Sequence, residues 1–310
     1  MGPSSWRPLA QGRVLRERAR ISAAVREFFA AREVLEVDVP VLGDCSVTDP
    51  YIDALRLSEP ELWLQTSPEY YMKRLLAADS GSIYYFGKAF RADEQGRLHH
   101  REFTMLEWYR TGFDDRDLMD ELCALISALD NTLHQQRCTY ADTFRAALGV
   151  NPHSCSDRDL AELAAERCGV SWRDEPRATW LNLLFSQCVE PSLPPGLCIV
   201  YDYPECLSAL ARTACNAEGE LCARRFEAFI NGCELANGYY ELTDAQEQRE
   251  RFAKDNCERA RLGKPRIQAD PQLLAALESG IPDCAGVALG FDRLIKALLD
   301  LSSIAEQRSF

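Results

Sequence analysis

The chain has 310 residues, of which 46% are hydrophobic and 27% charged, the proportions of an ordinary globular protein with room for one large domain. Its 48 acidic residues outnumber its 35 basic ones, and the formal net charge of −13 argues against a broad nucleic-acid-binding surface. Because the sequence shows no apolar run that could span a bilayer, no secretory signal pattern and no zinc-ligand spacing among its 13 cysteines, we expect a cytoplasmic protein with reduced thiols.

The N-terminal part predicts a long amphipathic helix followed by an extended strand. Apolar residues recur at helical spacing at Ile21, Val25, Phe28 and Phe29. Alternating apolar residues over 35–39 then lead to Pro40. A second helix is predicted to begin with Ser67 as its N-cap and Pro68 at its first position. Glu69 could serve the helix dipole or a ligand, and the local pattern leaves both open.

Residues 83–90 and 102–110 predict two strands of a long hairpin, joined by the polar loop 91–101. Both faces of the second strand are largely apolar, so we expect it at the centre of a sheet. Glu107 is then an acid in a buried row, and a buried acid needs a partner. A structural arginine and a ligand amine remain open alternatives.

The middle of the chain offers elements but little chemistry. Leucines at helical spacing predict a helix over residues 115–134. Residues 138–195 predict small helices joined by polar turns, one of them capped by Ser156. A short strand follows at 199–203, and a charged helix capped by Asp244 is predicted to run to about residue 262.

The stretch 225–241 predicts a hairpin with a cluster of acids. The Asn-Gly pair at 231–232 favours a two-residue type I′ turn, because both central residues need positive φ. That turn places Phe229 opposite Glu234 and leaves Glu227 diagonal to Glu234 on the same face. The two carboxylates would then lie close enough to share a hard cation.

Gly238, inside the second strand of this hairpin, predicts a β-bulge. One extra residue would return Glu241 to the face of Glu227 and Glu234. Three acids on a face rich in Phe and Tyr need cations or amines to meet them. An ordinary solvated face with surface acids is the alternative.

Near the C-terminus, residues 286–293 predict a short apolar strand that passes through Gly290 into a helix ending near Leu301. Arg293 falls in the first turn of that helix. A cation is unfavourable at the positive end of a helix dipole, so we expect an anionic ligand nearby.

Three segments together resemble the motifs of class II aminoacyl-tRNA synthetases of the lysyl type. Motif 1 is resembled by Pro40 after the first helix and strand, motif 2 by Phe90-Arg91 through Glu102-Phe-Thr-Met-Leu-Glu-Trp-Tyr109, and motif 3 by Ala288-Leu-Gly-Phe-Asp-Arg293. The segments Ser-Pro-Glu-Tyr-Tyr-Met-Lys-Arg-Leu-Leu76 and Glu-Leu-Ala-Asn-Gly238 are similar to a family of truncated paralogues, the elongation factor P–(R)-β-lysine ligases. The resemblance implies an α+β fold with an antiparallel sheet flanked by helices. It also implies one catalytic domain over residues 1–310, a helical insertion at about 138–195 and no anticodon-binding domain.

Roles toward ATP follow from the resemblance. Arg91 and Arg293 would be the catalytic residues, holding the α- and γ-phosphates, and Phe103 would stack on adenine. Glu227 and Glu234 would bind Mg²⁺. The residues implied to bind ATP are Arg91, Ala92, Asp93, His100, Phe103, Glu234, Leu235, Gly290 and Arg293.

The resemblance also implies a pocket for a substrate with two amino groups. Its residues would be Ser67, Pro68, Glu69, Glu107, Tyr109, Asn237, Tyr239 and Glu241. Several acids facing a dication form the expected charge complementarity. The chain departs from the family pattern at Ala92-Asp93 and His100-Arg101, which affects the loop contacts to ATP. Ala288 replaces a glycine of motif 3, and its methyl group hints at a lysine-like substrate other than α-lysine.

The implied activity is an ATP-dependent ligase that activates (R)-β-lysine as an adenylate and transfers it to a lysine side chain of elongation factor P. A lysine-type tRNA ligase without its anticodon domain is one alternative. A catalytically silent, synthetase-like binding protein is another, although the phosphate-binding arginines and metal-binding acids are present.

Because the chain is acidic, we expect elongation factor P and not tRNA as the acceptor. Lys73, Arg74, Arg97 and Arg101 are expected to steer that acceptor toward the site. We also expect a homodimer whose interface uses the apolar stripe of Ile21, Val25 and Phe28.

Overall fold

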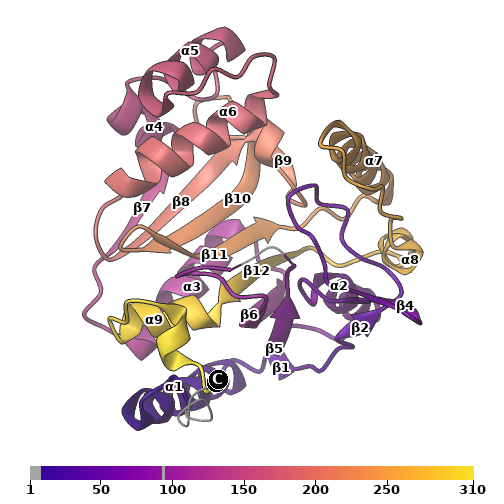
Figure 1. Cartoon of the computed structure of the whole chain (residues 1–310). Helices are drawn as coiled ribbons and strands as arrows, with labels where there is room; N and C mark the ends of the chain where they lie inside the picture. The colour runs from indigo at the N-terminus through magenta and orange to yellow at the C-terminus, as the bar shows by residue number, and fades with distance from the viewer. Residues whose placement is uncertain (1–7, 93–94) are drawn as a thin grey trace.

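The computed structural model describes residues 8–92 and 95–310, which form an α+β fold around one large sheet (Figure 1). In spatial order its strands are β1 (Leu35–Glu36), β5 (Ile83–Phe90), β6 (Glu102–Thr111), β12 (Cys284–Gly290), β11 (Cys233–Tyr240), β10 (Leu221–Ile230), β8 (Leu197–Pro204) and β7 (Gln135–Thr139), with β9 (Thr213–Cys215) paired to β10. Among these described strands, the outer pairs β1–β5 and β7–β8 are parallel and the others antiparallel. The predicted antiparallel sheet flanked by helices is confirmed.

The helices are α1 (Gly12–Ala30), α2 (Glu69–Ala77), α3 (Asp115–Leu129), α4 (Tyr140–Leu148), α5 (Asp157–Cys168), α6 (Arg177–Leu184), α7 (Ala245–Arg261), α8 (Pro271–Ser279) and α9 (Phe291–Leu298). One sheet face is covered by α1, α3 and α9, whose apolar residues pack against Leu106, Trp108 and Val287. Within the described ranges, no helix combines the length and apolarity needed to cross a membrane.

Two separate layers cover parts of the opposite face. At the top of Figure 1, α4, α5 and α6 pack on β8 and β10 through a cluster that includes Tyr140, Trp180 and Phe229. On the right, α2, α7 and α8 share a second cluster beside a small sheet of β2 (Leu42–Gly43), β4 (Glu61–Leu64) and β3 (Arg56–Ser58). Part of the sheet remains uncovered between the two layers.

The predicted apolar stripe of α1 is buried inside the subunit. Ile21 is 1% exposed, Val25 0% and Phe28 7%, because the helix lies across the sheet next to Trp108. The prediction that this stripe supplies a dimer interface is therefore wrong, since a side chain packed in its own core cannot also face a partner.

Several element boundaries differ from the prediction. The helix predicted over 115–134 ends at Leu129, where the backbone becomes extended. Residues 135–139 form β7, a strand that was not predicted and that takes the first two residues of the segment 138–195, for which small helices were predicted. The last helix ends at Leu298 and not near residue 301. At α2 the N-cap position is Pro68, although the Ser67 hydroxyl accepts a hydrogen bond from the Glu69 N–H at 3.1 Å.

The hairpin of β10 and β11 closes at the predicted turn. Asn231 has φ of 50° and Gly232 φ of 72°, as a type I′ turn requires. Phe229 pairs with Glu234 as predicted.

The bulge in this hairpin is not at Gly238, as we predicted. The register shifts directly after Glu234, so Leu235 is the extra residue. Gly238 instead makes room for a ring, because a Cβ there would lie 2.3 Å from Phe226 Cζ. Either position adds one residue between Glu234 and Glu241, so the three acids of the hairpin still share one face.

Candidate active site

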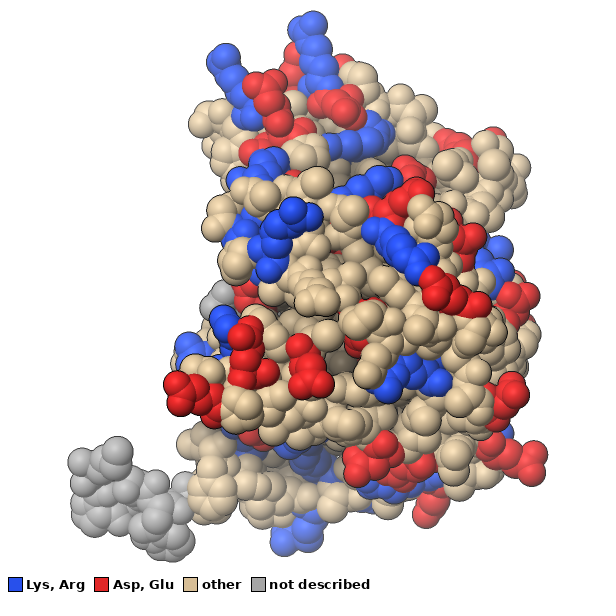
Figure 2. Space-filling view, turned by 90° about the vertical axis from the view of Figure 1, so that its right-hand side faces the viewer, with Lys and Arg blue, Asp and Glu red and all other residues tan. Residues whose placement is uncertain are grey.

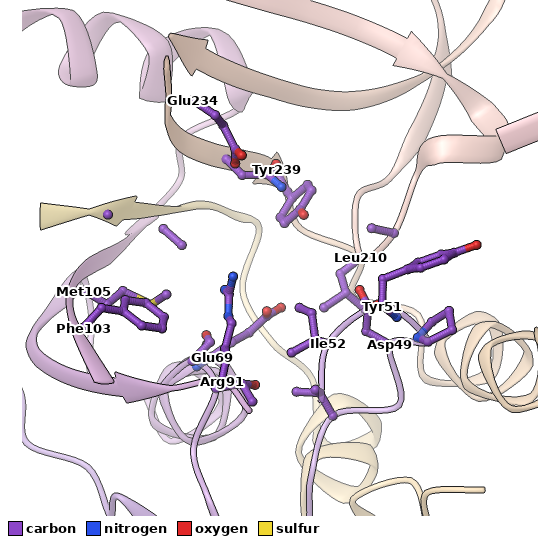
Figure 3. A pocket seen from close by; sticks show the side chains of 18 of the residues that line it. Asp49, Tyr51, Ile52, Glu69, Arg91, Phe103, Met105, Leu210, Glu234 and Tyr239 are labelled. Atoms are coloured by element: carbon purple, nitrogen blue, oxygen red, sulfur yellow. Dashed lines mark hydrogen bonds between the residues drawn. The ribbon is translucent and has the colours of Figure 1, made fainter. Parts of the chain in front are cut away.

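A cavity of about 490 Å³ opens on the uncovered part of the sheet (Figure 3). Its wall is formed by β6, β11 and β12, by the start of α2, and by the segments 47–52 and 206–210. Figure 3 shows Arg91 pointing into the cavity, with Phe103 on one side and Ile52 on the other.

Most residues predicted to bind ATP or the amino acid line this cavity: Ser67, Glu69, Arg91, His100, Phe103, Glu234, Leu235, Asn237, Tyr239, Gly290 and Arg293. The wall does not include Pro68, Ala92, Glu107, Tyr109, Glu227 and Glu241. Asp93 lies outside the described residues. The fold thus brings together side chains from segments that are far apart in the sequence.

Arg91, Phe103, Glu234 and Arg293 form one part of the site, which we call the arginine end. The Arg91 guanidinium lies 5.2 Å from the centre of the Phe103 ring. Arg293, in the first turn of α9, donates to the backbone oxygen of Glu234 at 3.0 Å and to its carboxylate Oε2 at 3.3 Å. It also contacts His99 Nε2 at 2.5 Å. One guanidinium group beside an aromatic ring, with a second guanidinium in the same cavity wall, suits a ligand that combines an anion with a flat ring.

Glu227 lies behind this end. Its Oε1 is ion-paired with Arg225, which is 15% exposed, and its Oε2 accepts a hydrogen bond from the Tyr203 hydroxyl at 2.8 Å. Burial raises the pKa of Glu227, Arg225 opposes that shift, and the Glu234 carboxylate adds to it.

Glu234 lines the cavity with carboxylate oxygens that suit Mg²⁺, and a cation there would relieve the repulsion between Glu234 and Glu227. The described residues contain no group of three or more His, Cys, Asp or Glu side chains arranged to hold a metal. Oxygens of a bound ligand would therefore have to complete the coordination, as is common for Mg²⁺.

Glu69, Lys73, Glu107, Tyr109 and Glu241 form the other part of the site, which we call the acid cluster. Glu107, 2% exposed on β6, accepts hydrogen bonds from the hydroxyls of Tyr109 and Ser67, both at 2.8 Å. Burial, and then the carboxylate of Glu69, raise the pKa of Glu107 to about 8. The sequence left open whether an arginine or a ligand amine is the partner of Glu107. Within the protein its partners are two hydroxyl groups, and not an arginine.

Lys73 joins two carboxylates of the cluster. Its Nζ lies 2.7 Å from Glu69 Oε1 and 2.7 Å from Glu241 Oε2. Burial raises the pKa of Glu241 to about 7, and Lys73 opposes that shift. The prediction that Lys73 steers an acceptor is wrong, because its side chain is only 2% exposed and points to the sheet. Arg97 and Arg101 are exposed, and Arg74 is partly exposed.

Gly286 on β12 provides the space behind the cluster. It pairs with Tyr109, and a Cβ at this position would lie 2.3 Å from Tyr109 Cε1 and 2.6 Å from Glu241 Oε1. The Tyr109 ring and the Glu241 carboxylate therefore occupy the volume that a larger residue would fill.

The sequence pattern missed Lys73, Arg225 and His99 as site residues. Lys73 follows Glu69 by four residues, which is the spacing of a helical ion pair and the signal that could have identified it. Arg225 precedes Glu227 by two residues on the same strand face, which gives a weaker signal. We find no local signal for His99.

The loop residues that depart from the family pattern have local partners. His100 Nδ1 accepts from the backbone N–H of Glu102 at 3.2 Å, and the Arg101 carbonyl accepts from the N–H of Arg91 at 2.9 Å. The N–H of Ala92 donates to the carbonyl of Asp53 at 2.7 Å. These contacts connect the loop to Glu102 at the start of β6 and to Asp53, next to the segment 47–52.

The sequence of the whole chain is similar to those of known proteins. The sequence profile of the class II tRNA synthetases (D, K and N) matches residues 5–310. The chain is 44% identical to the elongation factor P–(R)-β-lysine ligase of Vibrio parahaemolyticus, over 99% of this chain and 98% of that protein. It is 45% identical to the protein of that name in Vibrio vulnificus and 42% identical to the one in Avibacterium paragallinarum, with 99% and 100% of this chain and 98% of each relative covered.

Proposed function

Because this chain belongs to the family of class II tRNA synthetases (D, K and N), we propose that it is an ATP-dependent ligase that activates (R)-β-lysine as an aminoacyl-adenylate and transfers it to a lysine side chain of elongation factor P. The observation that carries the proposal is the cavity that the arginine end lines and that the acid cluster adjoins through Glu69. One end suits an anionic nucleotide, and the other suits the amino groups of a diamino acid. Relatives of this length and similarity carry the same ligase name.

In the proposed activation step, ATP lies at the arginine end with its adenine on Phe103. Arg91 faces the α-phosphate and Arg293 the γ-phosphate. A carboxylate oxygen of the amino acid attacks the α-phosphorus in line, a P–O bond forms, and pyrophosphate leaves. This step needs no side chain as nucleophile, because positioning and cationic groups on the developing charge promote it.

Glu234, supported by Glu227 behind it, would hold Mg²⁺. When bound, the ion supplies positive charge to the phosphate oxygens. Glu234 suits this role because its side chain is 43% exposed in the cavity. Arg293, which contacts the Glu234 carboxylate, would exchange that contact for one with the triphosphate.

In the proposed transfer step, the neutral amine of the acceptor lysine attacks the carbonyl carbon of the adenylate. An amide C–N bond forms, the C–O bond to the phosphate breaks, AMP leaves, and the attacking amine loses one proton. The acid cluster holds the amino groups of bound β-lysine as ammonium ions, which are not nucleophilic. The cluster therefore protects the substrate from attacking another adenylate.

A protein acceptor suits this surface better than tRNA. Binding to tRNA needs many contacts from Lys and Arg to phosphates. Figure 2 shows Lys and Arg interspersed with Asp and Glu on the face in view, without a continuous basic field, and the formal charge of the chain is −13. Since elongation factor P acts in translation, we place the reaction in the cytoplasm, where the 13 free thiols would remain reduced.

We also propose a homodimer, formed by a surface other than the α1 stripe. Large apolar side chains are exposed around β1 and the small sheet: Leu35 at 57%, Val41 at 39%, Leu42 at 39% and Leu57 at 42%. Sedimentation at micromolar concentration should give twice the 35.0 kDa chain mass, and Leu42→Lys should shift the protein toward monomer. A wild-type monomer under these conditions would contradict the dimer.

The test of the proposed function is ATP–pyrophosphate exchange with α-lysine, (R)-β-lysine and (S)-β-lysine, followed by transfer of radiolabel to elongation factor P or tRNA. We expect the highest kcat/KM with (R)-β-lysine and an acid-stable amide on elongation factor P. Label in a base-labile tRNA ester, with elongation factor P unlabelled, would support the tRNA ligase. Absence of exchange with all three substrates would support the silent binding protein.

A further inference from the structure

We propose that Lys73 is a positioning residue for the amino-acid substrate, whose buried ammonium bridges Glu69 and Glu241 and matches the charge of the acid cluster to a substrate with two ammonium groups. The inference rests on the proposed function for the nature of the substrate. Lys73 takes no direct part in the activation and transfer steps described above.

Lys73 connects two layers of the site. It lies on α2 one turn after Glu69, which lines the cavity, and it reaches Glu241, which follows β11 and is 1% exposed. Both contacts are 2.7 Å long. One ammonium therefore holds a carboxylate of the cavity wall against a carboxylate behind it.

The oxygens that Lys73 leaves free suit a second ammonium. Lys73 takes Glu69 Oε1 and Glu241 Oε2, one oxygen of each carboxylate. Both carboxylate oxygens of Glu241 are buried without a hydrogen-bond partner among the described residues, and the Lys73 ion pair reaches Oε2 and leaves Oε1 unmatched. A buried carboxylate oxygen without a donor is costly, and an ammonium group of the substrate would supply the donor.

The charges of the cluster match such a substrate. Glu69, Glu107 and Glu241 carry three negative charges when ionised, and Lys73 carries one positive charge, which leaves a formal −2. The two ammonium groups of a diamino acid carry +2. Without Lys73, the three carboxylates would face the same substrate with one excess negative charge and without a fixed spacing between Glu69 and Glu241.

Stability alone does not explain a lysine at this place. A buried ion pair contributes little net stability, and an apolar side chain of similar length often serves a fold equally well. Lys73 instead places its charge between two acids, one of which lines the cavity, an arrangement that benefits a cationic ligand more than it benefits the fold.

The test compares Lys73→Met with the parent enzyme in ATP–pyrophosphate exchange with (R)-β-lysine. We expect the KM for (R)-β-lysine to rise about 30-fold and the KM for ATP to change less than twofold, because the arginine end is intact. Lys88→Met is the matched control, since it removes an ion-paired but half-exposed lysine, and we expect both KM values to stay within twofold. Lys73→Arg keeps the positive charge but replaces the ammonium with a wider, planar guanidinium, and should raise the amino-acid KM by about three- to tenfold.

The pH dependence of the amino-acid KM separates positioning from a structural role. Glu107, Tyr109 and Ser67 face the two bridged acids from β6 and from the start of α2. Loss of the Lys73 ammonium should raise the pKa of Glu241 further, so the amino-acid KM of Lys73→Met should fall with rising pH only about one pH unit above the parent.

Three outcomes bear on the proposal. If Lys73→Met melts earlier but keeps the parental KM values and pH profile, or if the KM for ATP rises equally, Lys73 is not a positioning residue. If Lys73→Met does not fold, Lys73→Arg decides by the same ratio of KM values. If the parent shows no exchange with any lysine isomer, the proposed function fails, which is a different result from a failure of the Lys73 proposal.

Discussion

The arginine end lines the cavity, whereas the acid cluster adjoins it through Glu69, and the two regions differ in how their charges are paired. At the arginine end, Glu234 is 43% exposed and Arg293 18%, and their mutual contact of 3.3 Å is long. In the acid cluster, Lys73 is 2% exposed and Glu241 1%, and their contact is 2.7 Å. The first region presents charges for a ligand to meet, whereas the second has already paired most of its charges internally.

Because of this difference, mutations in the two regions should have different effects on ligand binding and on stability. An exposed charge is solvated in the free protein, so its loss affects ligand binding more than stability. A buried charge with a buried partner cannot be removed alone without leaving the partner uncompensated. Changes at the arginine end should therefore reduce activity in a stable protein, and changes in the acid cluster should affect both stability and substrate binding.

The largest expected effect is that of Glu234→Gln, which removes one charge without changing size. We expect exchange activity to fall by about a thousandfold, since the variant loses its exposed metal ligand. The midpoint temperature of thermal unfolding should change by less than about 1 °C, because the Glu234 side chain is 43% exposed. Near-normal exchange in the folded variant would remove Glu234 from the metal site.

Gly286→Ala tests the acid cluster. The new methyl group would lie 2.3 Å from Tyr109 Cε1 and 2.6 Å from Glu241 Oε1, so the ring and the carboxylate must move. We expect a loss of about 1–3 kcal/mol in unfolding free energy, measured by denaturant titration, and an amino-acid KM raised about 10- to 30-fold.

Gly12→Ala is the control for this change. The added Cβ would lie 3.6 Å from the flexible Arg16 side chain, so the unfolding free energy should not decrease. If Gly286→Ala loses stability but keeps its amino-acid KM, the cluster is not part of the substrate pocket.

The pH dependence of substrate binding tests the cluster without a mutation. The pKa of Glu107 is about 8, and the ammonium groups of the substrate favour its ionised form. The amino-acid KM should fall by about tenfold between pH 6.5 and pH 8.5 while the KM for ATP stays constant. In Glu107→Gln the fall should be weaker. A KM that stays flat over this range in the parent would separate Glu107 from the substrate.

The Glu107 carboxyl also links pH to stability: a rising pH should improve substrate binding but lower the stability of the fold. Its folded pKa of about 8 exceeds the ordinary value of 4.5, so the folded protein holds the proton more tightly than the unfolded chain does. The contribution to stability is complete below pH 4.5 and is lost as the pH rises through 8. Thermal unfolding of the parent should therefore occur at a lower temperature at pH 9 than at pH 6, and Glu107→Gln should reduce this difference.

The smallest effect is expected for Tyr203→Phe, which removes one hydrogen bond to Glu227 behind the arginine end. A hydrogen bond to a charged group contributes about 1.5–3 kcal/mol, but Arg225 still holds the carboxylate. We expect the Mg²⁺ concentration for half-maximal exchange to rise about threefold and the amino-acid KM to stay constant. An equal change in both quantities would show that the two ends are not independent.

Local patterns in the sequence predicted much of the frame of the site. The Asn-Gly turn set the register of the hairpin, because positive φ at two adjacent residues depends on those residues alone. The apolar rows around Glu107 predicted a central strand, and that residue is 2% exposed. The face shared by the three hairpin acids also followed from local spacing, although the bulge that produces it lies at Leu235 and not at Gly238.

Only the tertiary structure decided what each charge meets. Lys73 could be read as a surface base from its neighbours, but the packing of α2 against the sheet buries it and brings it to Glu241, far away in the sequence. In the same way, the contact of α1 with Trp108 decided that an apolar stripe is core and not interface. A turn or a strand depends on φ, ψ and spacing within a few residues, whereas burial and ion pairing depend on which distant segment occupies the neighbouring space.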